Sequence, residues 1–173
     1  VIGKDAQSIK LTDGSVNPSV LLSFGNDNNK GIILPYIETL PSTAAPGTLI
    51  FNATADAEYK VKVKLNSGWK NLSVESGTFG LTGTALTDFT TKVKGIQTTK
   101  VEKPNAKVVI GTTPSASTPA GILVLESTTK AMVLPIVDSY DKIINPSPGM
   151  MVFTTINNQL AVFNGQKWSF WKP

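Results

Sequence analysis

One pattern occurs twice in this chain, and it limits the possible folds more than any other feature. Residues 30–51 read KGIILPYIETLPSTAAPGTLIF, and residues 130–153 read KAMVLPIVDSYDKIINPSPGMMVF. Each copy has a lysine, an apolar run ending in Leu-Pro, an apolar pair followed by an acid, a proline-containing loop, and an apolar strand ending in Phe. Such a repeat indicates either a binding site presented twice or a duplicated piece of scaffold.

The order of matching residues is kept along both copies. Lys30 aligns with Lys130 and Trp69 with Trp168, while VIG at residues 1–3 is echoed by VIG at residues 109–111. We therefore predict a duplication, with copy one at residues 1–73, a bridge at residues 74–107 and copy two at residues 108–173.

Short strands joined by turns fit this composition better than helices. The chain has 14 Gly and 11 Pro among 173 residues, and the apolar residues fall in short runs or alternate with polar ones. The sequence predicts an all-β protein of two related small β modules joined by a Gly/Thr-rich bridge. The expected strands lie at residues 19–24, 31–34, 48–52, 59–65, 121–126, 131–134, 150–155 and 160–163.

Little helix is expected. The bridge is rich in Gly and Thr, so we interpret it as a linker with some extended structure. Residues 138–145 could form one or two helical turns that Pro146 ends, and residues 87–93 could form another short helical segment.

Several functional classes lack the residues they need. The chain has no Cys and no His, so disulfides, Cys-ligated zinc and Ser-His-Asp catalysis are excluded, and no cofactor is expected. The net charge of +4 comes mostly from scattered lysines, which argues against nucleic-acid binding. No apolar run reaches the roughly 18 residues that a membrane-spanning helix needs.

Copy two resembles a module found in surface and tail-fibre-like proteins of Bacteroidetes bacteria and their phages. The resemblance rests on VVIGTTPSASTPAGILVLESTTKAMVLPIV, INPSPGMMVFTT and NNQLAVFNGQKW, which together cover about residues 108–169. Copy one fits through VIG, NNKGIILPYI, APGTLIFN and SGW. The Pro-Arg that usually follows Leu-Pro in the family is replaced by Ile136-Val137 and by Tyr36-Ile37, so any role of that Arg is lost.

The resemblance implies a secreted or surface-displayed β-rich structural module without enzymatic activity. We expect an extracellular or cell-surface location with a leader removed, and protein partners in a surface or fibre assembly that could be a homotrimer. The alternative is a carbohydrate- or receptor-binding module of a tail-fibre-like protein that contacts polysaccharide. A glycosidase, the third hypothesis, would need paired carboxylates such as Asp56 with Glu58 or Asp138 with Asp141.

Six residues are the candidate contact surface: Trp171, Tyr36, Tyr59, Lys60, Lys62 and Lys64. Trp171 has no counterpart in copy one, whereas the recurrence of Trp69 and Trp168 favours a role in the core. The three lysines could attract acidic polysaccharide, but protection of an edge strand against aggregation explains them better. Lys30 and Lys130 are interpreted as turn residues, with Leu-Pro ending a strand.

Overall fold

The computed structural model describes residues 13, 15, 17–24, 30–53, 59–73, 82–95, 101, 103, 106, 108–111 and 121–172. Most of the described elements are short strands, and the predicted all-β class is confirmed. The echo at residues 1–3 and the acids Asp56 and Glu58 lie outside the described residues.

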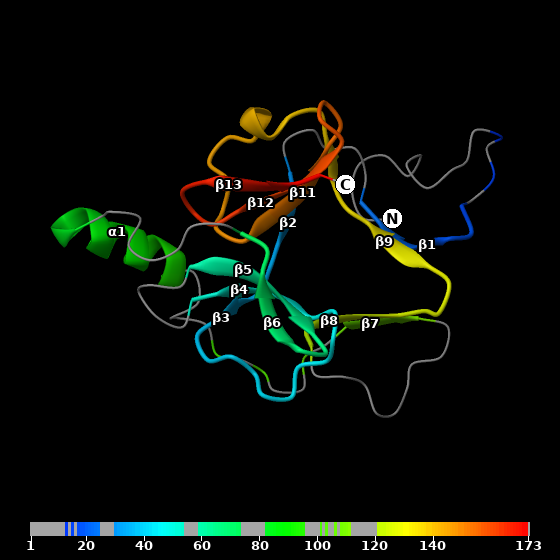
Figure 1. The fold of residues 1–173 in the computed structure, drawn as a ribbon, viewed down its shortest axis with the longest axis horizontal. Helices are drawn as coiled ribbons and strands as arrows, with labels where there is room; N and C mark the ends of the chain where they lie inside the picture. The colour runs from blue at the N-terminus through cyan, green and yellow to red at the C-terminus, as the bar shows by residue number, and fades with distance from the viewer. Residues whose placement is uncertain are drawn as a thin grey trace.

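Two four-stranded units repeat the same strand order (Figure 1). The first, here called module one, contains β3 (Tyr36–Ile37), β4 (Leu49–Asn52), β5 (Lys60–Leu65) and β6 (Gly68–Asn71). The second, module two, contains β10 (Ile136–Val137), β11 (Met150–Thr154), β12 (Gln159–Phe163) and β13 (Trp168–Trp171). In both, the first pair of strands is parallel and the next two pairs are antiparallel.

The pairing register is also the same in both modules. Tyr36 lies opposite Phe51 in module one, and Ile136 lies opposite Phe153 in module two. The Leu-Pro step has a structural explanation, because the carbonyls of both prolines accept a hydrogen bond from the following strand. The two donors are the N–H groups of Phe51 and Phe153, each at 2.9 Å. The two modules therefore share their pairing register and these backbone hydrogen bonds.

The strands begin and end where the local sequence requires it. Gly47 and Gly149 precede β4 and β11 and have φ of 90° and 76°, a region that a side chain disfavours. The side chain of Asn164 accepts hydrogen bonds from the N–H groups of Gln166 and Lys167, which fixes the turn between β12 and β13.

The two modules share one hydrophobic core. Its buried residues come from module one, from the bridge and from module two. Phe51 is fully buried, and its ring centroid lies 4.9 Å from that of Tyr36 and 6.5 Å from that of Tyr59. Met151 and Val162 of module two belong to the same cluster. A second cluster lies within module two, around Val152 and Phe163.

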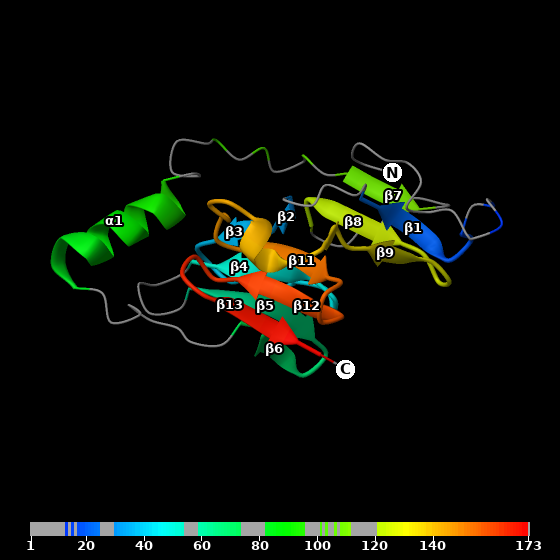
Figure 2. The ribbon, with the colours of Figure 1, turned by 90° about the horizontal axis from the view of Figure 1, so that it is seen from above.

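Within the bridge the structure describes α1 (Gly83–Lys94), where extended structure was expected. The helix is longer than the expected segment at residues 87–93 and lies beside one end of the two sheets (Figures 1 and 2). Phe89 and Val93, one helical turn apart, are buried in the shared core. The ring of Phe89 meets that of Tyr59 edge to face, with centroids 5.1 Å apart. Core packing therefore overrides the weak helix propensity of a Thr-rich segment.

Two further pairs of strands lie at the opposite end of the molecule from α1 (Figure 2). There β1 (Val20–Ser23) pairs in parallel with β9 (Ala131–Val133), and β7 (Val108–Gly111) pairs in parallel with β8 (Leu123–Glu126). The expected helix at residues 138–145 is a single 3₁₀ turn at Tyr140–Lys142. Among the described helices, none is long and apolar enough to cross a membrane.

Candidate interaction surface

A strand of copy one crosses to the sheet of module two. This strand, β2 (Ile32–Ile33), pairs antiparallel with β11, placing Ile33 opposite Met150 and Ile32 opposite Met151. The N–H of Leu34 extends the ladder by donating to the carbonyl of Gly149 at 3.2 Å. The outer edge of β11 is thus completed by a segment that lies more than a hundred residues earlier in the sequence.

The start of the crossing strand fits closely against β11. A Cβ atom placed on Gly31 would lie 2.6 Å from Cγ1 of Val152 and 2.9 Å from the carbonyl oxygen of Met151. Both distances are below normal contact, and the second involves backbone. Glycine therefore allows copy one to approach module two at this point.

Tyr36 fastens the modules together at the next position. Its hydroxyl donates a hydrogen bond of 2.6 Å to the carbonyl of Pro148, and only 6% of the residue is exposed. Burial raises the pKa of Tyr36 to about 12, because the phenolate would lose its hydration there. Next to this bond Gly149 lies against Phe51, since a Cβ on Gly149 would lie 2.9 Å from the Phe51 Cβ.

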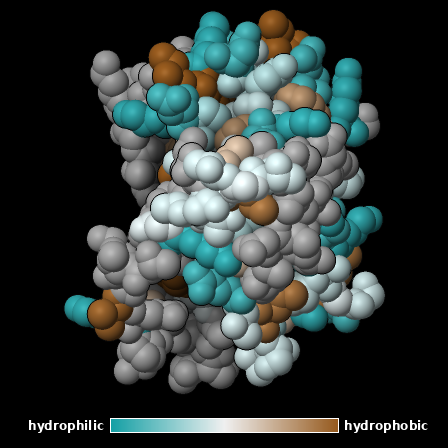
Figure 3. All heavy atoms as spheres, turned by 90° about the vertical axis from the view of Figure 1, so that its left-hand side faces the viewer, coloured by the Kyte–Doolittle hydropathy of each residue, from teal (hydrophilic) through white to brown (hydrophobic). Residues whose placement is uncertain are grey.

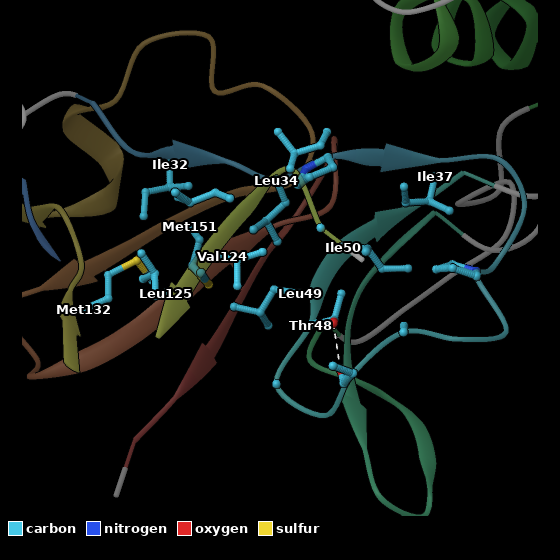
Figure 4. A pocket seen from close by; sticks show the side chains of 18 of the residues that line it. Ile32, Leu34, Ile37, Thr48, Leu49, Ile50, Val124, Leu125, Met132 and Met151 are labelled. Atoms are coloured by element: carbon cyan, nitrogen blue, oxygen red, sulfur yellow. Dashed lines mark hydrogen bonds between the residues drawn. The ribbon is translucent and has the colours of Figure 1, made fainter. Parts of the chain in front are cut away.

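Within the described part of the chain, no strand pairs with the equivalent edge in module one, which is called the open edge below. A groove of about 1130 Å³ runs beside it, lined by Gly47, Thr48 and Leu49 from module one and by further residues from β2, β8 and β9. Figure 4 shows Leu49, Val124, Met132 and Met151 around this space. A Cβ on Gly47 would meet nothing within 4 Å, in contrast to one on Gly149.

The candidate residue Trp171 lies at the end of β13 and is 41% exposed. Its indole Nε1–H donates a hydrogen bond to the carbonyl of Leu72 in copy one. Beside it Phe170 is 40% exposed and packs on Tyr140, with ring centroids 4.8 Å apart. The edge strand of module two therefore carries two partly exposed aromatic side chains, here called the aromatic group, which point to opposite faces of β13.

The candidate lysines do not lie on an edge strand, so our explanation of them as edge protection was wrong. They belong to β5, which lies between β4 and β6. Lys62 is 8% exposed, while Lys60 and Lys64 are half-buried. The ammonium of Lys64 lies 5.9 Å from the centroid of the Trp69 ring, a cation–π contact.

Two further candidates are not at the surface. Tyr59 is fully buried, and Tyr36 is almost so, because both belong to the shared core. Their aromatic character suggested exposed stacking surfaces, but a small β protein also uses large rings to fill its core. Trp168 packs on Phe163 with ring centroids 5.1 Å apart, and Lys30 and Lys130 are exposed.

Residues that the sequence did not single out form the contact between modules. The carbonyl of Pro148 accepts the hydrogen bond of Tyr36, and that of Gly149 accepts one from the N–H of Leu34. Gly149 also packs against Phe51, and Met150 pairs with Ile33. The available signal was the repeat, because Pro46, Gly47 and Thr48 hold the same places in copy one. Within the part of the chain that the structure describes, no group of three or more acids is placed to hold a metal ion.

The face that carries α1 offers no single large apolar area among its described residues. In Figure 3 the hydrophobic residues occur in small groups separated by hydrophilic ones. The open edge of β4 and the aromatic group on β13 lie outside this face and are two features that another molecule could contact.

Comparison with known proteins bears on one part of the chain. Residues 95–172 match the family model described as "Phage tail like trimerisation region". The searches of curated proteins and of solved structures each found no match. The matched residues begin just after α1, contain β7 to β13 and so include all of module two. The second half of this chain is therefore similar to a trimerisation region of phage tail-like proteins.

Proposed function

We propose that this chain is a non-enzymatic structural subunit of a trimeric, tail-fibre-like assembly outside the cell. The observation that carries the proposal is the match of residues 95–172 to a phage tail-like trimerisation region. The pairing of β2 with β11 supports it, because the sheet of module two is already completed by a strand from copy one. The Bacteroidetes origin and the surface location expected from the sequence belong to this proposal.

The mechanism would be presentation of rigid β units. Two sheets with the same strand order share one core, so the chain can hold partners at fixed separation without a moving part. Its partners would be other copies of the chain and further proteins of the fibre. The proposal assigns no cofactor and no nucleic acid to it.

The mass of the purified chain in solution tests this function. We expect native mass spectrometry and light scattering to give three times the chain mass of 18.4 kDa at micromolar concentration. A chain that remains monomeric at the highest soluble concentration would refute the trimer.

A second candidate function is carbohydrate binding at the exposed aromatic group. Phe170 and Trp171 are each about two-fifths exposed on an edge strand, where a sugar ring could stack. A glycan array with the wild-type chain and with Phe170→Ala tests this, since Phe170 has no hydrogen bond to copy one that its loss would break. This function is ruled out if no glycan binds the wild-type chain, or if every glycan that binds it also binds Phe170→Ala.

A further inference from the structure

The two modules differ at one edge of the sheet. Because their pairing register is the same, the two edges can be compared residue by residue. On β11 the outer edge at Met150 and Met151 is paired with β2. On β4 the equivalent residues are Thr48 and Leu49, and among the described residues no strand pairs with this edge. The groove described above lies there instead.

We propose that the open edge of β4 receives residues 131–134 of a second copy of this chain, as the edge of β11 receives residues 31–34 of its own chain. The repeat sets the register. Because Ile33 lies opposite Met150 and Ile32 opposite Met151, Val133 of the neighbour lies opposite Thr48 and its Met132 opposite Leu49. The proposal rests on the proposed function, because it names the contact by which copies assemble.

The accepting backbone groups point the right way. Phe51 donates its N–H to Pro35 across the outer edge of β4. Since alternate residues of a strand direct their backbone groups to the same edge, Leu49 presents its N–H and carbonyl on this edge too. The sheet of module one therefore offers an incomplete ladder next to a groove with apolar walls.

The donating strand has a matching edge, with which no other described strand pairs. The N–H of Ala131 donates to the carbonyl of Ser19 at 2.7 Å, so residue 131 faces β1. The backbone groups of Met132 and Leu134 then face the opposite edge, as those of Ile32 and Leu34 do when they pair with β11. Within the described part of the chain, the N–H of Leu134 has no hydrogen-bond acceptor of the kind that Leu34 finds in Gly149.

Side chains on the donating side also differ in the expected direction. Leu34 and Phe51 are buried where they meet module two, with 6% and 0% of their surface exposed. Their equivalents Leu134 and Phe153 are only partly buried, Leu134 against the shared core. Docking on a second copy would place Phe153 on Gly47, where a Cβ now meets nothing within 4 Å, as Phe51 lies on Gly149.

The two pairing positions differ by one substitution at the start of the incoming strand. Ala131 stands where copy one has Gly31, and a methyl at Gly31 would contact Val152 and the Met151 carbonyl at under 3 Å. The incoming strand must therefore begin slightly farther from β4 than β2 does from β11. Its ladder pairs, at positions 132 and 133, lie beyond this point.

Cysteine crosslinking tests the contact directly, because the chain contains no Cys of its own. In the variant Thr48→Cys/Val133→Cys, we expect a disulfide between chains. The pair lies one step from the Leu34–Gly149 type of hydrogen bond, where Cβ atoms of antiparallel strands approach most closely. Mixing ¹⁵N-labelled and unlabelled chains before oxidation and analysing the linked peptides by mass spectrometry shows whether the bond joins two molecules.

Two matched variants serve as controls. Ile33→Cys/Met150→Cys has the same geometry within one chain and should give a disulfide in the monomer band. Thr48→Cys/Leu134→Cys shifts the register by one residue, which turns the two side chains to opposite faces, and should crosslink poorly. Met132→Pro in the Thr48→Cys/Val133→Cys background removes the N–H that would pair with Leu49. It should lower the crosslink to the yield of the shifted pair.

The outcomes separate the two proposals. The inference is overturned if Thr48→Cys/Val133→Cys closes only within one chain or not at all, while Ile33→Cys/Met150→Cys closes. A trimer by native mass spectrometry with that result leaves the proposed function standing and moves the contact elsewhere. A monomer with that result refutes both. Crosslinked pairs in a chain that assembles to some other number would support the strand exchange and refute the trimer.

Discussion

The hydroxyl of Tyr36 donates a buried hydrogen bond to the carbonyl of Pro148, which lies 112 positions later in the chain. The bond joins the start of one module's sheet to the loop before the central strand of the other. The residue of copy two that aligns with Tyr36 is Ile136, which has no hydroxyl. This hydrogen bond is therefore formed at only one of the two equivalent positions.

Replacing Tyr36 by Phe should lower the free energy of unfolding by about 1–3 kcal/mol, because the Pro148 carbonyl then stays buried without its donor. Urea denaturation, monitored by tryptophan fluorescence, measures this change in the free energy of unfolding. Tyr140→Phe, on the half-buried 3₁₀ turn, is the matched control and should have a smaller effect. Equal losses in the two variants would contradict the role of this hydrogen bond.

The same tyrosine predicts a loss of stability at high pH. Burial raises its pKa from 10.0 to about 12, so the unfolded chain releases the proton first as the pH rises. Its contribution is constant below pH 10 and decreases by about 2–3 kcal/mol between pH 10 and pH 12. Lysines and other tyrosines titrate in that range as well, so the measurement is the difference between wild type and Tyr36→Phe. The difference in the free energy of unfolding between the two chains should decrease by a similar amount over this pH range. A difference that stays constant would contradict the raised pKa of Tyr36.

Phe51→Ala should destabilise both modules. The side chain is fully buried and contacts Tyr36, Tyr59 and Gly149, so its removal should cost about 3–5 kcal/mol. Because module two shares this core, hydrogen exchange should accelerate in β11 and β12 as well as in β4. Acceleration limited to module one would show that the modules unfold independently.

Gly149→Ala should be more damaging than Gly47→Ala. Both glycines have positive φ, which costs an L-residue about 1–2 kcal/mol. Only at Gly149 would the new methyl also collide with Phe51. Under dilute conditions, where copies do not associate, the midpoint temperature of thermal unfolding should therefore be lower for Gly149→Ala than for Gly47→Ala. The reverse order would refute this packing.

Thr154→Val should leave stability unchanged or increase it by about 1 kcal/mol. The Thr154 hydroxyl is buried and has no hydrogen-bond partner among the described residues, so a methyl of similar shape removes an unmet polar group. Chemical denaturation of the two chains is sufficient to test this. A clear loss of stability would indicate that the hydroxyl has a partner.

Much of the local structure could be predicted from the sequence. The alternation in residues 60–65 predicted β5, and short apolar runs predicted seven further strands close to their observed bounds. The apolar alternation continues to Leu65, but this residue lies past the end of the core and is 39% exposed. Burial of Lys62 could not be read from the pattern, since it depends on what covers the second face of the sheet.

Pairing between distant segments could not be predicted. Residues 31–34 match residues 131–134 in pattern, so nothing local indicates which sheet each segment joins. The difference between Gly31 and Ala131 acts only when the strand meets Val152, a contact formed by the folded chain. For the same reason the helix α1 was underestimated, because Phe89 and Val93 find their partners in both modules.

The pairing of β2 with β11 gives the chain a direction. A strand tethered in the same molecule is present at an effective concentration in the millimolar range, so β11 is filled before any other copy arrives. The edge of β4 is then left for a neighbour, and the contact between copies is head-to-tail rather than symmetric. In a trimer this contact closes into a ring, in which each copy donates strand 131–134 to one neighbour and receives the strand of the other neighbour at its own β4.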